Sequence, residues 1–352
     1  MPEVMVTNFN PNFTGVSSTT ANVIREQKET YDVRLVGRPL PNAPTPITTA
    51  EARALSRSTP ENRPFTIWHV RRNPEMRAAL WARDVLRLPI KIVFTSAKQR
   101  RHSAHPRWLI RQMDAVIGTT KAASALVPNV WATVPHGINT HTFFPSEDRA
   151  SAWAKLGYGG TMGFATMGRT RPEKGTDIFV EAMIELLPEV PGAVALVCGW
   201  ASSFYKKFEA DLKAQVAAAG LQDRILFLGE VPAEKQPELL RALTLTVQLP
   251  RYEGFGVVPL EGMASGTPFV GSDTGFYRSL SSGGATGNIV PLQCSPQETA
   301  AAIRDLLQPD RHAQAALEAR RIADAEFSAR HEAAGINEVY ERLWAGERRT
   351  DR

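Results

Sequence analysis

The sequence has almost no cysteine and no long hydrophobic run. Cys198 and Cys294 are its only cysteines, and each lies among apolar or small residues. Two distant cysteines argue against a disulfide framework and a cysteine-ligated metal, and they are typical of buried thiols in a reducing cytoplasm. The longest stretch without Asp, Glu, Lys or Arg is Ala122–Ser146, whose prolines and histidines argue against a bilayer span. The opening residues, MPEVMVTNFNPNF, lack a basic segment followed by an apolar run, so we expect no export signal and a cytoplasmic protein.

The length and composition indicate a folded protein with more than one core. The chain has 352 residues, of which 43% are hydrophobic and 22% charged. These fractions are ordinary for globular proteins and exclude a disordered, collagenous or coiled-coil chain. Single cores stop growing at roughly 250–300 residues, so we expect two domains.

The charge is unevenly distributed. Residues 1–150 carry 20 basic and 11 acidic side chains, whereas residues 151–352 carry 21 and 25. Within the first part, Arg63–Arg111 holds 12 basic side chains and only Glu75 and Asp84 as acids. This excess favours an anionic partner, because arginine binds phosphates in a bidentate manner. A solvated basic surface is the alternative. No zinc-finger, helix-turn-helix or RNA-recognition signature accompanies the charge, so we expect no nucleic acid partner.

Short apolar runs alternate with amphipathic segments of helix length in both parts of the chain, which indicates an α/β fold with doubly wound parallel sheets. We expect an N-terminal Rossmann-like domain over 1–148, a C-terminal Rossmann-like domain over 149–332, and a final helix and tail over 333–352 that can cross back to the N-terminal domain. The Pro-rich interval Pro39–Pro64 reads as an excursion from the first domain. The predicted strands are Val4–Asn8, Val33–Val36, Thr66–Val70, Lys91–Thr95, Ala115–Gly118, Thr133–Val134, Gly163–Met167, Val194–Cys198, Ile225–Leu228, Leu243–Leu249, Pro268–Gly271 and Asn288–Pro291.

The most informative stretch, YEGFGVVPLE at 252–261, follows a predicted strand and opens a predicted helix. Gly254 and Gly256 allow the backbone to approach a ligand, and Pro259 suits the first helical position. The amides of a helix N-terminus and the helix dipole together favour an anion such as a diphosphate. Glu253 and Glu261 would flank it. Alternatively, Glu261 only complements the helix dipole and Glu253 is a solvated loop acid.

A second stretch, MGRTRPEKG at 167–175, follows the first predicted strand of the C-terminal domain. Arg169 and Lys174 bracket a turn and would supply the fixed positive charge that a leaving diphosphate needs. No Asp-rich metal site is evident, so we expect no metal and no cofactor. The alternative interpretation is a surface turn that happens to carry three basic residues.

Taken together, these stretches resemble the retaining GT-B glycosyltransferases of family 4. The resemblance rests on Glu253…Glu261, on Gly168-Arg169…Glu173-Lys174-Gly175 and on the Pro-x-Gly element at Pro135-His136-Gly137. WHVRRN at 68–73, VFTSAKQRRH at 93–102 and RWLIR at 107–111 are similar to the lipopolysaccharide core mannosyltransferases of alphaproteobacteria. The resemblance implies the GT-B fold, in which two Rossmann-like domains face each other across a cleft, with the nucleotide sugar mostly in the C-terminal domain and the acceptor mostly on the N-terminal one.

The resemblance also implies roles for individual residues. Glu261 matches the glutamate that binds the nucleotide ribose, and Glu253 the glutamate near the transferred sugar. Arg169 and Lys174 match the pair that binds the diphosphate, so Arg169, Lys174 and Glu253 are the expected catalytic residues. Gly15 matches the N-terminal glycine loop, although this chain has one glycine where many relatives have two. The expected donor-binding residues are Gly15, Gly168, Arg169, Lys174, Glu253, Gly254, Phe255, Gly256, Val257, Val258 and Glu261.

The acceptor side departs from the family pattern. Many relatives carry a histidine where Ala97 aligns, and His69 with a neighbouring arginine could substitute for it; a buried structural histidine is the alternative. Many relatives also have Asn-Gly-Val-Asp where this chain has HGIN at 136–139, which leaves the contacts of His136 open. The expected acceptor-side residues are His69, Arg71, Arg72, Arg100 and Arg101.

The resemblance therefore implies transfer of mannose from GDP-mannose to a lipopolysaccharide core acceptor of the lipid A–Kdo type, with retention of the anomeric configuration. The basic segment would face anionic lipids at the cytoplasmic surface of the inner membrane. A hexosyltransferase that uses a UDP-sugar such as UDP-glucose is an alternative, because the motifs recognise diphosphate and ribose better than base or sugar. Two glutamates would also suit a glycosidase, and the basic segment alone would suit a non-catalytic module that binds anions, nucleic acid or membranes. An NAD enzyme fits less well, because Pro259 replaces the third small residue of its glycine motif.

Overall fold

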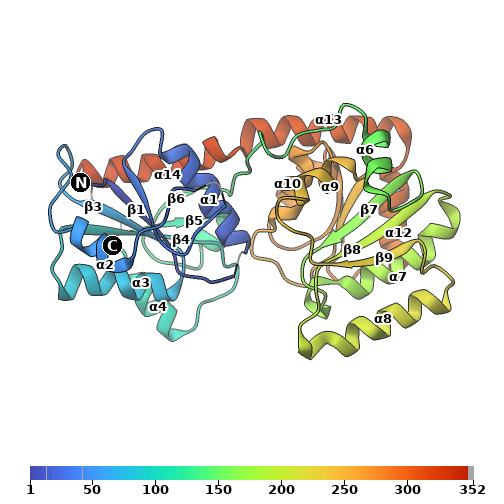
Figure 1. Cartoon of the computed structure of the whole chain (residues 1–352), viewed down its shortest axis with the longest axis horizontal. Coiled ribbons are helices and arrows are strands. Elements are labelled where there is room, and N and C mark those ends of the chain that lie inside the picture. Colours follow the sequence, from blue (N-terminus) through green and yellow to red (C-terminus); the bar gives the residue numbers. More distant parts are fainter. Residues whose placement is uncertain (13, 42, 348–352) are drawn as a thin grey trace. The chain divides into compact units, whose positions relative to one another are not determined.

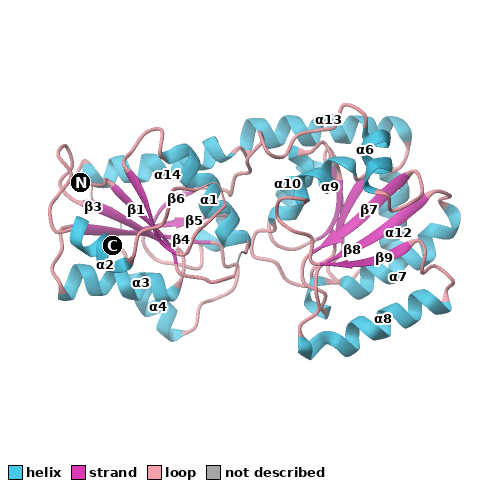
Figure 2. Ribbon diagram, in the orientation of Figure 1, coloured by secondary structure: helices cyan, strands magenta, loops and turns pink. Residues whose placement is uncertain are grey.

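The computed structural model describes residues 1–12, 14–41 and 43–347, which form two compact units (Figure 1). The N-terminal unit comprises Met1–Gly137 and the chain from Phe327 onward, and the C-terminal unit comprises Ile138–Glu326. Each unit contains one parallel six-stranded sheet with helices on both faces (Figure 2). The predicted α/β class with two doubly wound sheets is therefore confirmed.

The sheet of the N-terminal unit has the strand order β2-β1-β3-β4-β5-β6. Val4 and Val6 face a core shared with Ile24 and Tyr340, whereas Met5 faces the opposite core with Trp68. Both faces are thus buried, which explains why its strands are almost continuously apolar. Its strands are β1 (Val4–Asn8), β2 (Val33–Gly37), β3 (Thr66–Val70), β4 (Ile90–Ser96), β5 (Ala115–Gly118) and β6 (Val130–Thr133).

Helices α1 and α14 pack together on one face of this sheet, and α3 and α4 cover the other. Helix α14 returns to this unit because Ile336, Val339, Tyr340, Leu343 and Trp344 form a buried stripe at helical spacing. The helices of this unit are α1 (Gly15–Gln27), α2 (Thr49–Leu55), α3 (Asn73–Leu80), the π-helical turn η1 (Trp81–Val85), α4 (Ala104–Arg111), α5 (Lys121–Ser124) and α14 (Ala329–Trp344).

The sheet of the C-terminal unit has the order β12-β11-β10-β7-β8-β9. Residues of α7, α8 and α12 share one core with the strands. Its strands are β7 (Met162–Met167), β8 (Ala193–Cys198), β9 (Ile225–Gly229), β10 (Leu245–Gln248), β11 (Phe269–Ser272) and β12 (Gly287–Val290). Its α-helices are α6 (Arg149–Leu156), α7 (Thr176–Leu186), α8 (Lys206–Ala218), α9 (Gln236–Ala242), α10 (Val257–Ala264), α11 (Tyr277–Leu280), α12 (Pro296–Leu306) and α13 (Pro309–Glu326), and its 3₁₀ turns are η2 (Pro172–Lys174), η3 (Leu187–Glu189), η4 (Ser203–Tyr205) and η5 (Ser282–Gly284).

The structure differs from the sequence prediction in four places. The units divide after Gly137 and after Glu326, whereas the predicted boundaries follow residues 148 and 332. Strand β6 begins at Val130, which pairs with Val116, and ends at Thr133, which is where the predicted strand begins. The interval Pro39–Pro64 includes α2 and a bridge from Ile47 to Val36. Helix α13 was not predicted, because alanines make up most of its apolar residues and three of its four buried ones, which gives a weak hydrophobic period.

The strand orders determine where each sheet can bind a ligand. In the N-terminal sheet the order reverses between β1 and β3, and in the C-terminal sheet between β7 and β10. At such a point the loops at the carboxyl ends of neighbouring strands turn in opposite directions and leave room between them. Both sequence motifs of the C-terminal domain follow β7 and β10, and the loop of Gly15 and the Arg71–Arg72 pair follow β1 and β3.

Candidate functional site

In the C-terminal unit the two loops at the reversal point pack directly on each other. Gly175 has φ +67°, and a Cβ at this position would lie 1.8 Å from the carbonyl oxygen of Leu249. Only glycine allows the loop after β7 to approach the end of β10 this closely. The close approach sets the distance between the Arg169–Lys174 turn and the Glu253 loop.

Lys174 and Glu253 form an ion pair across the two loops. The Lys174 Nζ donates to Glu253 Oε2 at 2.6 Å, and the amide of Gly254 donates to Glu253 Oε1 at 2.9 Å. The exposed fractions of the two side chains are 29% and 22%. The sequence predicts that both residues contact the donor, and the structure brings the two side chains together.

Arg169 is placed differently from Lys174. It is exposed in the same turn, next to Gly168 with φ +138°. Among the described residues its guanidinium has no hydrogen bond or ion pair. Of the three cations on this turn, Arg169 is unpaired, Lys174 pairs with Glu253, and Arg171 lies 3.7 Å from Glu173.

Helix α10 begins next to these loops. Its N-cap is Gly256, with φ +89°, and its first residue is Val257. The prediction placed Pro259 at the first helical position, but Pro259 is the third residue and Glu261 lies in the second turn. Proline is tolerated there because the first four amides of a helix have no partner within the helix. The amides of Val257 and Val258 therefore stay available for an anion.

Glu261 is a buried carboxylic acid with no hydrogen bond to its carboxyl group among the described residues. Glu261 is only 5% exposed. Burial raises the pKa of Glu261 to about 7, because the charged form loses its hydration. Hydroxyl groups of a ligand that donate hydrogen bonds to this carboxylate would replace the hydration that burial removes.

Two aromatic residues support the start of α10, and sequence reasoning missed one of them. Phe255 was expected to bind the donor, but its ring is 4% exposed and stacks on Phe276 at 4.8 Å. Its side chain is therefore part of the core, and only its backbone can reach a ligand. Tyr277 is also buried and lies directly against Gly256. No local sequence signal connects Tyr277 with Gly256.

We predict that Gly256→Ala destabilises the protein by about 2–5 kcal/mol and abolishes the thermal shift caused by nucleotides. The new Cβ would lie 2.1 Å from Cε1 of Tyr277, and the left-handed backbone conformation disfavours a side chain. The two costs are about 1–2 kcal/mol for the backbone and about 1–3 kcal/mol for overpacking. Thermal unfolding with and without nucleotide measures both effects.

Gly157→Ala is the matched control for this substitution. Gly157 has φ +73° at the end of α6, and nothing lies within 4 Å of the Cβ it would gain. This variant therefore carries the backbone cost alone and should keep the nucleotide shift. Equal behaviour of the two variants would contradict the role of the contact with Tyr277.

In the N-terminal unit a single carboxylate joins the loops at the reversal point. Glu75 is fully buried and accepts hydrogen bonds from the Thr7 hydroxyl, the Phe9 amide and the amides of Arg71 and Arg72. Arg72 Nη1 also donates to it at 3.0 Å. The local sequence signal for Glu75 is its position in the first turn of a helix that begins Asn73-Pro74.

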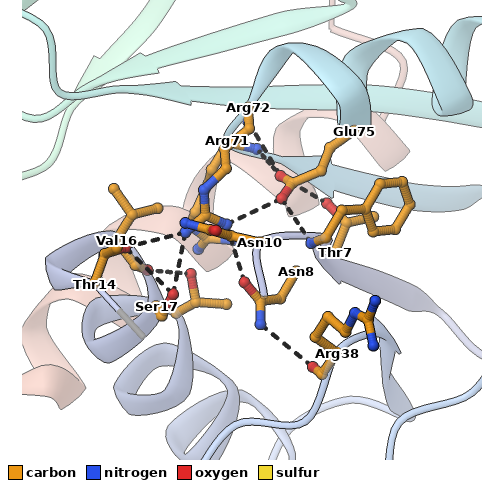
Figure 3. Close-up of polar contacts among 12 residues, drawn as sticks. Thr7, Asn8, Asn10, Thr14, Val16, Ser17, Arg38, Arg71, Arg72 and Glu75 are labelled. Carbon is orange, nitrogen blue, oxygen red and sulfur yellow. Dashed lines mark hydrogen bonds and ion pairs between the residues drawn. The ribbon is translucent and has the colours of Figure 1, made fainter. Parts of the chain in front are cut away.

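Arg72 extends this network to the start of α1. Figure 3 shows its guanidinium between Asn8, Thr14, Ser17 and Glu75, with distances of 3.0–3.3 Å to these four side chains. The Thr14 hydroxyl caps no amide of α1, so the arginine holds the segment beside Gly15 instead. Arg72 was expected to contact the acceptor, but all these bonds are to the protein, which favours a positioning role.

His69 is likewise engaged with the protein. Its ring is fully buried, with Nε2 at 2.7 Å from Thr95 Oγ1 and Nδ1 at 2.5 Å from the hydroxyl of Tyr340. Burial lowers the pKa of His69, so the ring is neutral. Both nitrogens are occupied, which favours the structural alternative over the predicted acceptor contact. Tyr340, on α14, is a further residue that sequence reasoning did not assign.

The remaining expected acceptor-side arginines separate into two kinds. Arg71 is only 9% exposed at the end of β3. Arg100 and Arg101 are exposed on the loop between β4 and α4. The Pro-x-Gly element lies elsewhere: His136 Nδ1 and the Gly137 amide both lie 2.8 Å from the buried carboxylate of Glu332 on α14.

No group of three or more His, Cys, Asp or Glu side chains within the described ranges is arranged to hold a metal ion. In the same residues, no helix has both the length and the apolar character needed to span a bilayer.

The chain is similar to known proteins in sequence and in fold. The model of the family described as glycosyl transferases group 1 matches residues 158–322. The chain is 41% identical over 353 residues to the lipopolysaccharide core biosynthesis mannosyltransferase LpsB of Rhizobium meliloti (strain 1021), with 97% of each chain covered. It is 39% identical over 342 residues to the mannosyltransferase LpcC of the same description from Rhizobium leguminosarum bv. viciae, covering 97% of this chain and 96% of that one. The crystal structure of Anabaena Alr3699/HepE in complex with UDP and glucose matches with a TM-score of 0.82 at 17% identity, over 97% of this chain and 100% of that one.

The two parallel six-stranded sheets are the GT-B fold, and the full-length relatives show that the protein is a glycosyltransferase. The protein is thus an enzyme of the class that the sequence predicted. Within that class, the chain belongs to the lipopolysaccharide core biosynthesis mannosyltransferases of glycosyl transferases group 1. The predicted family is confirmed.

Proposed function

We propose that this enzyme transfers mannose from GDP-mannose to a lipopolysaccharide core acceptor of the lipid A–Kdo type and retains the anomeric configuration. The observation that carries the proposal is the full-length similarity to two lipopolysaccharide core mannosyltransferases, in a chain whose Lys174 and Glu253 meet beside the N-terminus of α10. The proposal needs no metal and no cofactor.

The proposed mechanism is mainly electrostatic. The unpaired guanidinium of Arg169, the ammonium of Lys174 and the amides of Val257 and Val258 would stabilise the negative charge that develops on the departing GDP. Glu253 holds Lys174 in place and lies where the transferred sugar is expected. The acceptor hydroxyl attacks from the face that the diphosphate leaves, and a phosphate oxygen takes its proton. The mechanism therefore assigns no protein side chain as a general base.

Ligand-dependent thermal unfolding tests the donor. The protein is heated in EDTA with GDP, UDP, GDP-mannose, UDP-glucose or NAD, because a ligand at 100 times its Kd stabilises a fold by about 2.7 kcal/mol. We expect shifts with GDP and GDP-mannose only, followed by transfer of mannose and an NMR assignment of a retained anomeric centre. A shift with UDP and UDP-glucose alone would replace the donor with a UDP-sugar, and no shift at all would favour a non-catalytic binding module.

We predict that the affinity for GDP falls as the pH is lowered below about 7. The carboxyl group of Glu261, whose pKa burial raises to about 7, accepts stronger hydrogen bonds from ribose hydroxyls when it is charged, and can then accept them on both oxygens. Between pH 7 and pH 6 the charged fraction falls from about one half to about one eleventh, so the Kd should rise by up to about fivefold. Calorimetry in buffers of different ionisation enthalpy measures the accompanying proton release.

Glu261→Gln is the control for this pH dependence. It should bind GDP more weakly at pH 8 and with little change between pH 8 and pH 6. The folding stability of the protein without ligand changes with pH in the opposite direction to its affinity for GDP. A carboxyl group with a raised pKa favours the folded state at low pH, and this contribution is lost as the pH rises through about 7. A pH-independent Kd in the unchanged protein would contradict the assignment of Glu261 to the ribose.

We also propose that the enzyme works in the cytoplasm, at the inner face of the inner membrane. Not every basic residue of Arg63–Arg111 is available to contact the membrane. Arg63 pairs with Glu3 and Glu341, and Arg83 pairs with Asp114. Within Lys98–Arg111, the basic side chains of Lys98, Arg101 and Arg111 are exposed, and Trp108 is 56% exposed. Basic residues beside an exposed tryptophan suit an anionic membrane surface.

Vesicle binding checks this contact. We predict that the protein co-sediments with vesicles containing phosphatidylglycerol, that high salt releases it, and that Arg101→Glu weakens binding several-fold. Each basic residue near an anionic surface contributes about 1 kcal/mol. Arg57→Glu, at an exposed position on the segment after α2, makes the same charge change outside Lys98–Arg111 and should have little effect. Equal binding to neutral vesicles, or equal loss in both variants, would contradict the proposal.

A further inference from the structure

The N-terminal unit contains a buried arginine without a partner at its own reversal point. Arg71 follows β3, next to the loop that follows β1, and is 9% exposed. Among the described residues, neither Nη1 nor Nη2 of Arg71 forms a hydrogen bond, and both atoms are buried. Buried guanidinium groups are ordinarily paired, because the loss of hydration is otherwise uncompensated.

The nearby carboxylates do not supply the missing partner. Glu75 accepts the backbone amide of Arg71 at 2.8 Å, but its two oxygens are taken up by Thr7, Phe9 and Arg72. Glu332 is occupied by His136 and Gly137. Burial lowers the pKa of Arg71, and the charges of Glu332 and Glu75 act against this shift only from a distance.

The adjacent Arg72 provides the internal contrast. Its guanidinium is fully used in holding Asn8, Thr14, Ser17 and Glu75 together (Figure 3). The two consecutive arginines therefore differ. Arg72 holds the loops together, whereas Nη1 and Nη2 of Arg71 have no hydrogen-bond partner among the described residues. A planar fork of this kind matches an oxyanion, which it binds through two parallel hydrogen bonds.

We propose that Arg71 binds an oxyanion of the acceptor, either a sugar carboxylate or a phosphate, through Nη1 and Nη2. This inference rests on the proposed function, in which the diphosphate of the donor is held by Arg169 and Lys174 of the C-terminal unit. Arg71 lies at the ligand-binding edge of the other sheet, where a second substrate would be received. The assignment makes recognition of the acceptor depend on an anionic group beside the hydroxyl that reacts.

Thermal unfolding without turnover tests the binding itself. Wild type, Arg71→Met and Arg57→Met are heated with Kdo, with its methyl ester and with inorganic phosphate. Arg57 is the matched control, because its exposed side chain forms no hydrogen bond or ion pair among the described residues. We expect an anion-dependent shift in wild type and Arg57→Met that is absent in Arg71→Met. Arg71→Met without ligand should be as stable as wild type or more stable, since it removes an unpaired buried charge.

Kinetics then test the role in the reaction. Arg71→Met should raise the KM for an acceptor with a free carboxylate or phosphate by about 10- to 100-fold, the loss expected for hydrogen bonds to a charged group. The KM for the donor should stay unchanged, and Arg71→Lys should be intermediate. Esterifying the acceptor carboxylate and removing the acceptor phosphates are separate arms, and the arm that abolishes the difference between wild type and Arg71→Met identifies the oxyanion.

The results separate this inference from the proposed function. If wild type transfers no mannose, the proposed function fails, while the anion-dependent shift still decides whether Arg71 binds an oxyanion. If wild type transfers mannose and Arg71→Met keeps both the anion-dependent shift and the KM for the acceptor, the role of Arg71 is overturned. A less stable Arg71→Met with an unchanged acceptor KM would make the residue structural, which also overturns it.

Discussion

Replacing Arg169 or Lys174 by alanine is expected to lower kcat by roughly 10²–10³. Both cations would act chiefly in the transition state, when the diphosphate gains charge as the bond to the sugar breaks. Neither side chain is buried in the core, so both variants should fold like wild type. Steady-state kinetics at saturating donor and acceptor measure the loss, and unchanged turnover in both variants would refute the assignment of the pair.

Arg171→Ala is the matched control on the same turn. Its guanidinium lies 3.7 Å from the carboxylate of Glu173 and matches no diphosphate-binding position, so its removal should change kcat little. Lys174→Ala carries a second consequence, because it frees Glu253 from its ion pair. Lys174→Ala should therefore raise the KM for the donor as well, whereas Arg169→Ala should act mainly on kcat. An equal loss in Arg171→Ala would mean that the turn acts only through its total charge.

The largest expected effect on stability comes from Glu75→Ala. The carboxylate is fully buried and holds Thr7, Phe9, Arg71 and Arg72, and its removal leaves Arg72 without its buried counter-charge. Removing one partner of a buried ion pair typically costs about 3–5 kcal/mol. Urea unfolding measures the loss, with the transitions of the two units fitted separately because each has its own core.

Glu51→Ala serves as the comparison for Glu75→Ala. Glu51 also accepts from backbone and hydroxyl groups near a helix N-terminus, where it forms a capping box with Thr48. It is exposed, so water replaces the lost bonds and the effect should be much smaller. If the two variants lose the same stability, burial of Glu75 is not the source of its contribution.

The strands and the C-terminal motif were predictable because their signals are local. Buried parallel strands are read from short apolar runs, and most predicted strands agree with the structure to within a few residues. That the turn of Arg169 and Lys174 lies near the Glu253 loop could be expected, because each loop comes after a strand; the ion pair itself joins only Lys174 and Glu253. The predicted start of α10 was wrong by two residues, since proline is accepted at any of the first positions of a helix.

The acceptor side was less predictable because its contacts are between segments far apart in the chain. His69 pairs with Tyr340, 271 residues away, and this partner decides that the ring is buried and fully bonded. Arg71 and Arg72 are adjacent and chemically identical in the sequence, yet one is fully bonded to the protein and the other has two unpaired nitrogens. Nothing in the local sequence distinguishes them.

By itself, the sequence determined the α/β class, the two sheets and the family, because hydrophobic period and motif spacing depend on neighbours along the chain. It also proposed the residues of the basic turn at 168–175. Only the tertiary structure decided which of these side chains are engaged with the protein. The ion pair of Lys174 with Glu253, the raised pKa of Glu261 and the unpaired fork of Arg71 all arise from burial and from partners brought together by the strand order. The protonation and hydration of a side chain depend on its neighbours in three dimensions, and the spacing of residues along the sequence does not specify those neighbours.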